Sequence, residues 1–155
     1  MKNNKGFTVV ELIASFALTM VIVVFLFEVL IEIKDVFIET SLKTALQEKM
    51  GIISKNINAY FDTIGYAVSC SDNTCTLGDN IKVIVVDNNK VTVGNQKFNL
   101  PDGVSISSYE LKNEGEGGER CFLKVKLNLE SDNLSKQYQY NTVYFYDCHY
   151  SSISN

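Results

Sequence analysis

A single carboxylate inside a long apolar run is the feature of this sequence that most needs a chemical explanation. From Phe7 to Phe27 every side chain is apolar or small and uncharged, except that of Glu11. Such a run is long enough to cross a bilayer as a helix, which takes about 20 residues. A carboxylate near the start of such a helix is costly in lipid and is therefore usually functional. Glu11 is accordingly the first candidate functional residue.

Catalytic groupings have little support elsewhere in the sequence. A nucleophile needs a base and an orienting group, and the only histidine, His149, stands near the C-terminal end with no motif around it. The acidic segment 113–119, or Asp87 with its neighbouring asparagines, offers carboxylates for calcium, but no full ligand pattern surrounds them. We therefore expect no catalytic residue, no cofactor and no metal site, and predict that the protein is not an enzyme.

The four cysteines fit an exported protein with two disulfides. Cys70 and Cys75 are close enough in sequence to close a small loop, whereas Cys121 opens one expected strand and Cys148 ends the next. If the connection between these strands is centred near Leu134, Cys121 and Cys148 fall opposite each other in an antiparallel pair. We favour Cys70–Cys75 and Cys121–Cys148 among three possible connectivities. Free thiols remain the alternative if the export compartment lacks oxidants, and the spacings lack the C-x-x-C pairs typical of zinc sites.

The elements that position these residues begin with one long helix. Beyond the apolar run, large apolar residues recur at steps of three or four, which indicates an amphipathic helix. This stripe comprises Leu42, Leu46, Ile53, Ile57 and Tyr60 or Phe61, with Met50 nearby. No proline interrupts the pattern, and Gly65 is suited to the C-terminal cap. The sequence therefore predicts a helix from Phe7 to Ile64, with its first half in lipid and its second half against a globular core.

After Gly65 the hydrophobic period changes to two, which is typical of strands. We expect strands at 81–86, 90–93, 96–100, 104–111, 121–129 and 138–146, separated by turns rich in Asn, Gly and Pro and by an acidic loop at 113–119. The predicted fold class is α+β, with a long N-terminal transmembrane and amphipathic helix packed on an antiparallel β-sheet.

The N-terminal string KGFTVVELI, residues 5–13, resembles the signature of type IV pilins and other prepilin-like proteins: a basic leader, Gly, Phe, and Glu as the fifth residue after Gly. The resemblance implies that a membrane peptidase cleaves between Gly6 and Phe7 and methylates the new amine of Phe7. It also implies that Glu11 pairs with the N-terminal amine of a neighbouring subunit during assembly. An unpartnered buried carboxylate costs several kcal/mol, so such pairing would favour assembly and fix the register of the subunits.

Charge supports a defined orientation in the membrane. Lys2 and Lys5 precede the apolar run, and Glu28, Glu32 and Asp35 follow it beside Lys34. The positive-inside rule then places the N-terminus in the cytoplasm and the rest outside. We expect a leader at 1–6, a transmembrane and filament-core helix at 7–31, and the helix continuation with a C-terminal globular β domain at 32–155. The whole chain has 14 basic and 18 acidic residues, and this acidic balance argues against nucleic-acid binding by the globular part.

The resemblance implies a structural subunit of a type IV pilus, or of a pseudopilus for type II secretion or competence, and we favour a minor subunit. The partners it implies are the prepilin peptidase and methyltransferase, other pilin or pseudopilin subunits, an inner-membrane assembly platform and the bilayer. The alternative is a single-pass, membrane-anchored extracellular binding module that joins no filament. An ordinary signal peptide is disfavoured, because the apolar run exceeds 15 residues and no small-x-small cleavage site follows it.

Overall fold

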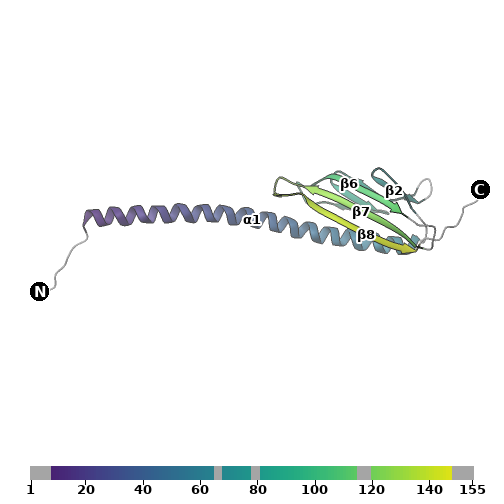
Figure 1. Ribbon diagram of the computed structural model, residues 1–155, viewed down its shortest axis with the longest axis horizontal. Helices are drawn as coiled ribbons and strands as arrows, with labels where there is room; N and C mark the ends of the chain where they lie inside the picture. The colour runs from purple at the N-terminus through teal and green to yellow at the C-terminus, as the bar shows by residue number, and fades with distance from the viewer. Residues whose placement is uncertain (1–7, 65–67, 78–80, 115–119, 148–155) are drawn as a thin grey trace, which may run out of the picture. The chain divides into compact units, whose positions relative to one another are not determined.

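The computed structural model describes residues 8–64, 68–77, 81–114 and 120–147 (Figure 1). The chain forms two compact units, Met1–Ile38 and Glu39–Asn155, and each is described by itself. One helix, α1 (Val9–Ile64), contributes residues to both units. The predicted end of the helix at Ile64 is confirmed. Its predicted first residue, Phe7, and its predicted cap, Gly65, lie outside the described residues.

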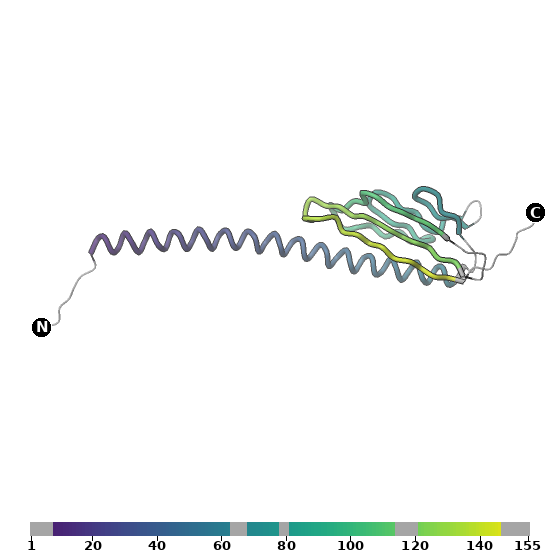
Figure 2. Tube along the Cα trace, viewed as in Figure 1, coloured from purple at the N-terminus to yellow at the C-terminus, as the bar shows by residue number. Residues whose placement is uncertain are grey.

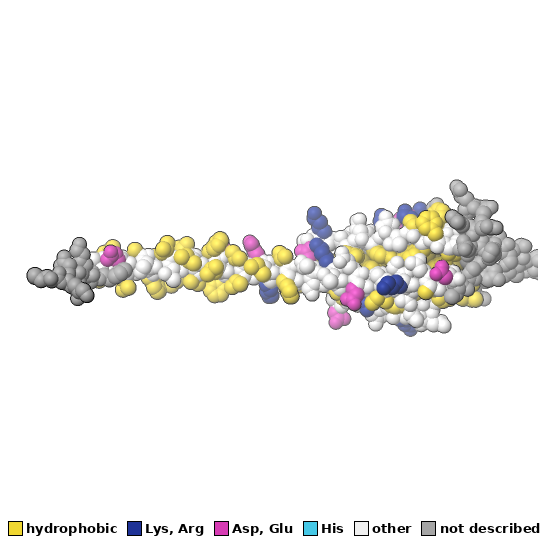
Figure 3. Space-filling view, turned by 90° about the horizontal axis from the view of Figure 1, so that it is seen from below, with side chains coloured by type: hydrophobic (Ala, Val, Ile, Leu, Met, Phe, Trp, Pro, Cys, Tyr) yellow, Lys and Arg dark blue, Asp and Glu magenta, His cyan; other side chains and the backbone are white. Residues whose placement is uncertain are grey.

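The first unit is the apolar part of α1. Its large side chains are exposed, from Val9 at 72% to Phe37 at 72%, and Figure 3 shows hydrophobic side chains along the length of this segment. The helix contains a window with a mean hydropathy of 2.6 and is long and apolar enough to cross a membrane. Exposed apolar area of this extent is unfavourable in water, so the segment needs lipid or other apolar helices around it.

The second unit combines the rest of α1 with two antiparallel sheets, whose chain path Figure 2 traces. The five-stranded sheet contains β1 (Ser69–Ser71), β2 (Thr74–Leu77), β3 (Ile81–Asp87), β4 (Lys90–Val93) and β5 (Gln96–Asn99) in sequence order. The three-stranded sheet contains β6 (Ser105–Glu114), β7 (Arg120–Glu130) and β8 (Tyr138–Asp147). The predicted α+β class is confirmed, with the strands divided between two sheets and with β1 and β2 as additional strands.

A single hydrophobic core joins α1 to both sheets. The predicted helical stripe is confirmed, and its side chains at the centre of the core are at most 1% exposed: Leu46, Met50, Ile53, Ile57 and Phe61. Tyr60 is only half-buried, so Phe61 is the residue that continues the stripe. Alternate residues of β7 meet this stripe, with Leu123, Leu127 and Leu129 fully buried, as the alternating pattern of that segment predicts.

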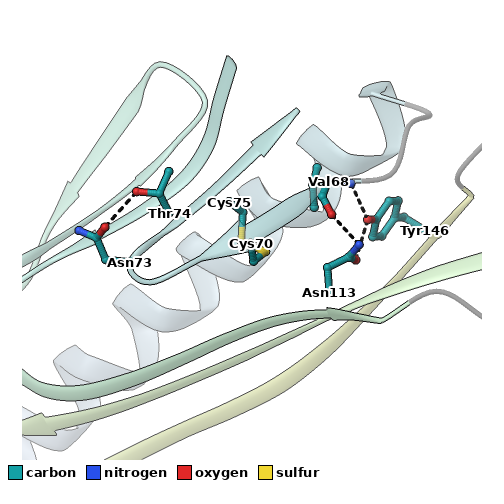
Figure 4. The surroundings of a disulfide bond; sticks show 7 residues. All are labelled: Val68, Cys70, Asn73, Thr74, Cys75, Asn113 and Tyr146. Atoms are coloured by element: carbon teal, nitrogen blue, oxygen red, sulfur yellow. Dashed lines mark hydrogen bonds between the residues drawn. A yellow bond between two sulfur atoms is a disulfide. The ribbon is translucent and has the colours of Figure 1, made fainter. Parts of the chain in front are cut away.

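The expected loop at 113–119 begins later than predicted, because Asn113 and Glu114 belong to β6. Asn113 is held there by side-chain hydrogen bonds (Figure 4). Its Nδ2 donates to the carbonyl oxygen of Val68 at 2.6 Å, and its Oδ1 accepts from the Tyr146 hydroxyl at 2.9 Å. The backbone N–H of Val68 donates to the same hydroxyl at 3.3 Å. This ring of hydrogen bonds ties β6, β8 and the residue before β1 together.

The turn between β4 and β5 requires glycine. Gly94 has a φ of 56°, a left-handed conformation that side chains rarely adopt. A Cβ at this position would also collide with the ring of Tyr60 on α1. The predicted turn at Gly94–Asn95 is thus confirmed, and its glycine permits the close approach of the hairpin to the helix.

Tyr144, which is buried, and Tyr138, which is partly buried, generate a prediction about alkaline stability. Burial raises the pKa of Tyr144 above its ordinary value of 10.0, and burial also raises the pKa of Tyr138. Because folding favours the protonated form, this stabilisation is present below pH 10.0 and is lost as the pH rises further. Each such tyrosine contributes a slope of at most about 1.4 kcal/mol per pH unit.

Tyr144→Phe should therefore be less stable than the wild type near neutral pH, by about 1 kcal/mol for the lost hydrogen bond to Tyr140. Its melting temperature should then fall less steeply than that of the wild type between about pH 10 and about pH 12. Thermal unfolding of the detergent-solubilised chain would measure both effects. Tyr109→Phe, at a residue 44% exposed, is the control for removal of a tyrosine hydroxyl from the surface. Parallel pH profiles for Tyr144→Phe and wild type would contradict the assignment.

Candidate functional site

The candidate functional site is the start of α1, where Thr8 and Glu11 form a reciprocal cap. The backbone N–H of Thr8 donates to Glu11 Oε2 at 3.0 Å, and the Thr8 hydroxyl donates to the same oxygen at 2.9 Å. In return, the backbone N–H of Glu11 donates to Thr8 Oγ1 at 3.3 Å. This is a capping box, in which a Thr before the first helical residue and a Glu three positions later satisfy two backbone donors.

The capping box gives Glu11 a local role that the sequence analysis did not identify, although the spacing T-x-x-E at residues 8–11 is its signal. A carboxylate in the first turn also interacts favourably with the partial positive charge at the helix N-terminus. Only Oε2 is used in the cap. Oε1 of Glu11 accepts no hydrogen bond from any described residue, so the carboxylate can take a further donor without losing the cap.

The other polar side chains of the apolar segment are satisfied within their own helix. The Ser15 hydroxyl donates to the carbonyl oxygen of Leu12 at 2.9 Å, and the Thr19 hydroxyl donates to the carbonyl oxygen of Ser15 at 2.8 Å. A hydroxyl bonded to its own backbone is tolerated in an apolar environment. Glu11 is thus the one charged side chain between Val9 and Phe27, and it retains capacity for a partner from outside the helix.

Two predicted site residues, Gly6 and Phe7, lie outside the described residues. Cleavage between them and methylation of Phe7 therefore stay predictions. Glu11 follows Phe7 by four residues in the sequence, and the structure places it in the first turn of α1.

Comparison with known families identifies the class of this N-terminal segment. Residues 1–27 match the prokaryotic N-terminal methylation motif, which is typical of type IV pilins and pseudopilins. The chain therefore carries a pilin-type N-terminus ahead of a pilin-like arrangement, an apolar helix followed by antiparallel sheets packed on its continuation. No curated protein and no solved structure shows significant similarity to the chain.

The structure confirms the disulfide between Cys70 and Cys75, with an S–S distance of 2.04 Å. The two residues form a directly opposed pair in the β1–β2 hairpin, as Figure 4 shows. The predicted register of the later pair is wrong: Cys121 lies opposite Tyr146 rather than Cys148. Cys121 is disulfide-bonded, but Cys148 lies outside the described residues, so the Cys121–Cys148 bond stays a prediction.

Metal and small-molecule sites gain no support from the described ranges. Within residues 8–64, 68–77, 81–114 and 120–147, no group of three His, Cys, Asp or Glu side chains is placed to hold a metal ion. Asp87 instead forms an ion pair with Lys90 at 3.5 Å. An open hollow of about 320 Å³ lies where α1 meets the β4–β5 turn, and it has no charged side chain: its lining is Asn56, Ala59, Tyr60, Val93, Asn95 and Gln96.

The remaining disulfide can be tested by peptide mapping without reduction. We expect a Cys121–Cys148 peptide beside the Cys70–Cys75 peptide. Replacing Cys121 and Cys148 together by Ser should then reduce the free energy of unfolding by roughly 2–4 kcal/mol, the usual effect of a disulfide. A peptide joining Cys121 to Cys70 or Cys75 would contradict both assignments.

Proposed function

We propose that this protein is a prepilin-like structural subunit, cleaved after Gly6, N-methylated at Phe7 and assembled into a type IV pilus or a related pseudopilus. The observation that carries the proposal is the N-terminal methylation motif over residues 1–27. The motif joins a processing site to an apolar helix, and both are needed for a subunit that leaves the membrane for a filament. The protein is not an enzyme in this proposal.

The geometry of Glu11 supports a role in assembly. Cleavage after Gly6 would create an amine on Phe7, close in sequence to the carboxylate. The Oε1 atom of Glu11 accepts no hydrogen bond from any described residue, so it can accept one from this amine of a neighbouring subunit while Oε2 maintains the cap with Thr8. An ion pair in an apolar surrounding is strong when its partners are in contact, and leaving either charge alone there is costly. The ion pair would therefore stabilise one axial position of each subunit relative to its neighbour.

The proposed orientation has the N-terminus in the cytoplasm and the second unit outside. Lys2 and Lys5 precede the apolar segment, whereas Glu28, Glu32 and Asp35 follow it. A disulfide between Cys70 and Cys75 is consistent with an exported domain. The partners in this proposal are the prepilin peptidase and methyltransferase, other pilin or pseudopilin subunits, the inner-membrane assembly platform and the bilayer.

We favour a minor subunit of a pilus, of a type II secretion pseudopilus or of a competence pseudopilus. Glu11 argues against the tip pseudopilin that typically lacks this acid. The alternative function is a single-pass, membrane-anchored binding module, which would also explain the apolar helix and the exported domain. The two differ in processing, because a simple anchor would retain residues 1–6.

The processing step gives a direct test. Gly6→Val should leave the protein uncut in the membrane, because a branched side chain before the cleaved bond would obstruct the peptidase. Intact-mass measurement of the wild type should show a chain that starts at methylated Phe7, and the variant should retain the leader. Asn4→Val places the same branched side chain two residues earlier and is the control, which should be processed normally. Removal of six residues from Gly6→Val would refute the cleavage assignment.

The role of Glu11 can be separated from its role in the cap by two variants. Glu11→Gln keeps an oxygen that can accept from Thr8 but removes the charge, whereas Thr8→Val removes the hydroxyl of the cap but keeps the charge. Both variants should be cleaved and inserted, and the second unit should melt as in the wild type. Incorporation into sheared filaments should fall at least about tenfold for Glu11→Gln, the effect of a loss of about 1.4 kcal/mol. Thr8→Val should retain most of the incorporation. Wild-type incorporation of Glu11→Gln together with a loss in Thr8→Val would assign Glu11 to helix capping alone.

A further inference from the structure

The two sheets end in four edge strands: β1, β5, β6 and β8. An edge strand exposes backbone N–H and C=O groups that can pair with another chain, and proteins usually protect such edges. Three of these edges are protected here. β1 has three residues, and β5 has four with a central lysine, Lys97. β6 has a register shift between Ile106 and Ser108, and its Ile106 N–H already donates to the carbonyl oxygen of Asn88 at 2.7 Å.

β8 has none of these protections. It is ten residues long. It pairs with β7 along its whole length, from Tyr138 to Asp147, without a register shift. Its sequence from residue 138 to residue 146, YQYNTVYFY, contains no charge, no proline and no glycine. Aromatic and β-branched residues, which favour strands, occupy most of these positions. A long, regular and uncharged edge of this kind is a template for a further strand.

The backbone along this edge is available. From Gln139 to Phe145, no backbone N–H or C=O group hydrogen-bonds to a described residue outside the β7–β8 pairing. Side chains on the outer face are also uncovered, with Val143 42% and Phe145 73% exposed. Pairing with a further strand would be favourable, because the backbone groups of this edge would gain hydrogen bonds and the apolar side chains would be removed from water.

We propose that β8 pairs with β8 of a second copy of this chain, antiparallel and about a twofold axis at Thr142. The positions of the tyrosines are symmetric about this residue. Tyr140 and Tyr144 lie two positions to either side of Thr142, and Tyr138 and Tyr146 lie four positions to either side. Antiparallel pairing in this register therefore places tyrosine opposite tyrosine, Thr142 opposite its own copy, and no charge opposite a like charge.

The residue pairs created by this register are favourable. Aromatic pairs and Thr–Thr pairs across antiparallel strands each contribute to stability, and the backbones add a continuous ladder of hydrogen bonds. On the outer face, Phe145 lies opposite Gln139 of the second copy, and Val143 lies opposite Asn141. The two three-stranded sheets would become one six-stranded sheet with self-complementary contacts, which is the usual form of a twofold interface.

A twofold contact is closed and self-complementary, so it does not propagate from subunit to subunit along one filament. This pairing would therefore join subunits of two filaments. This last consequence rests on the proposed assembly into filaments. The pairing itself does not, and it goes beyond the function proposed above.

The test uses the full-length chain in detergent, with cysteine cross-linking across the axis. Directly opposed residues have Cβ atoms about 5 Å apart, so Thr142→Cys should form a covalent dimer in high yield with a short bis-maleimide. Asn99→Cys, exposed on the edge strand β5, is the matched control and should stay monomeric. Sedimentation should show a dimer for the wild type. A monomeric wild type, or equal cross-linking of both variants, would overturn the proposal.

A charge placed on the edge should separate the two copies. Val143→Lys introduces two ammonium groups near the axis and should weaken dimerisation at least about tenfold, because like charges brought together at an interface strongly oppose association. Ile81→Lys, at another apolar residue that is 56% exposed, should leave the dimer intact. Both variants should melt cooperatively as folded chains. A Val143→Lys protein that dimerises like the wild type would show that the copies meet elsewhere and would refute the β8 pairing. Normal processing and filament incorporation of the same variant would leave the proposed function standing.

Discussion

Burial of one apolar stripe of α1 holds the second unit together. The stripe runs from Leu46 to Phe61 at steps of three or four residues, so its side chains project from one face of the helix. Each such side chain contributes about 1.5–3 kcal/mol when it is removed from water. Both sheets contribute to the same core, and neither a three-residue nor a four-residue strand such as β1 or β5 would be stable without that surface. The sheets are thus organised by the helix on which they pack.

The first unit differs from the second, because its apolar side chains are exposed and are not packed in a core. In a lipid or filament environment, polar groups must find partners inside the structure. The hydroxyls of Ser15 and Thr19 do so on their own backbone, and Thr8 and Glu11 satisfy each other. What remains is the negative charge of Glu11, which no side chain of the described helix neutralises. The cap and the charge are therefore two separate properties of one residue, and only the charge requires a second molecule.

The sequence predicted the elements whose hydrophobic period is strong. The stripe of α1 and the alternation in β7 were sufficient to locate the helix end, the long strands and the residues of the core. The hairpin of β1 and β2 escaped prediction, because its strands are short and built from Ser, Thr and Cys, with little apolar alternation. The division into two sheets was not predictable either, since it depends on packing against α1 rather than on any local pattern.

At the candidate site, sequence alone identified Glu11 but missed its bond to Thr8, although the spacing of a capping box was present. The register between β7 and β8 could not be derived from residue types. It depends on the geometry of the connecting turn, and a shift of two residues preserves every buried position while changing which residue faces Cys121. The pattern of burial therefore determines which side chains of a strand point into the core, but it does not determine which residue of the neighbouring strand lies opposite each of them.

The clustering of tyrosine on β8 has a spectroscopic consequence. The chain has no tryptophan and eight tyrosines, so its ultraviolet emission comes from tyrosine without transfer to an indole. Tyr138, Tyr140, Tyr144 and Tyr146 all lie on β8, and the Tyr146 ring packs 4.6 Å from Phe61 between ring centroids. Half of the tyrosines therefore lie on one strand, so emission and near-ultraviolet dichroism should change when the packing of β8 against the helix changes.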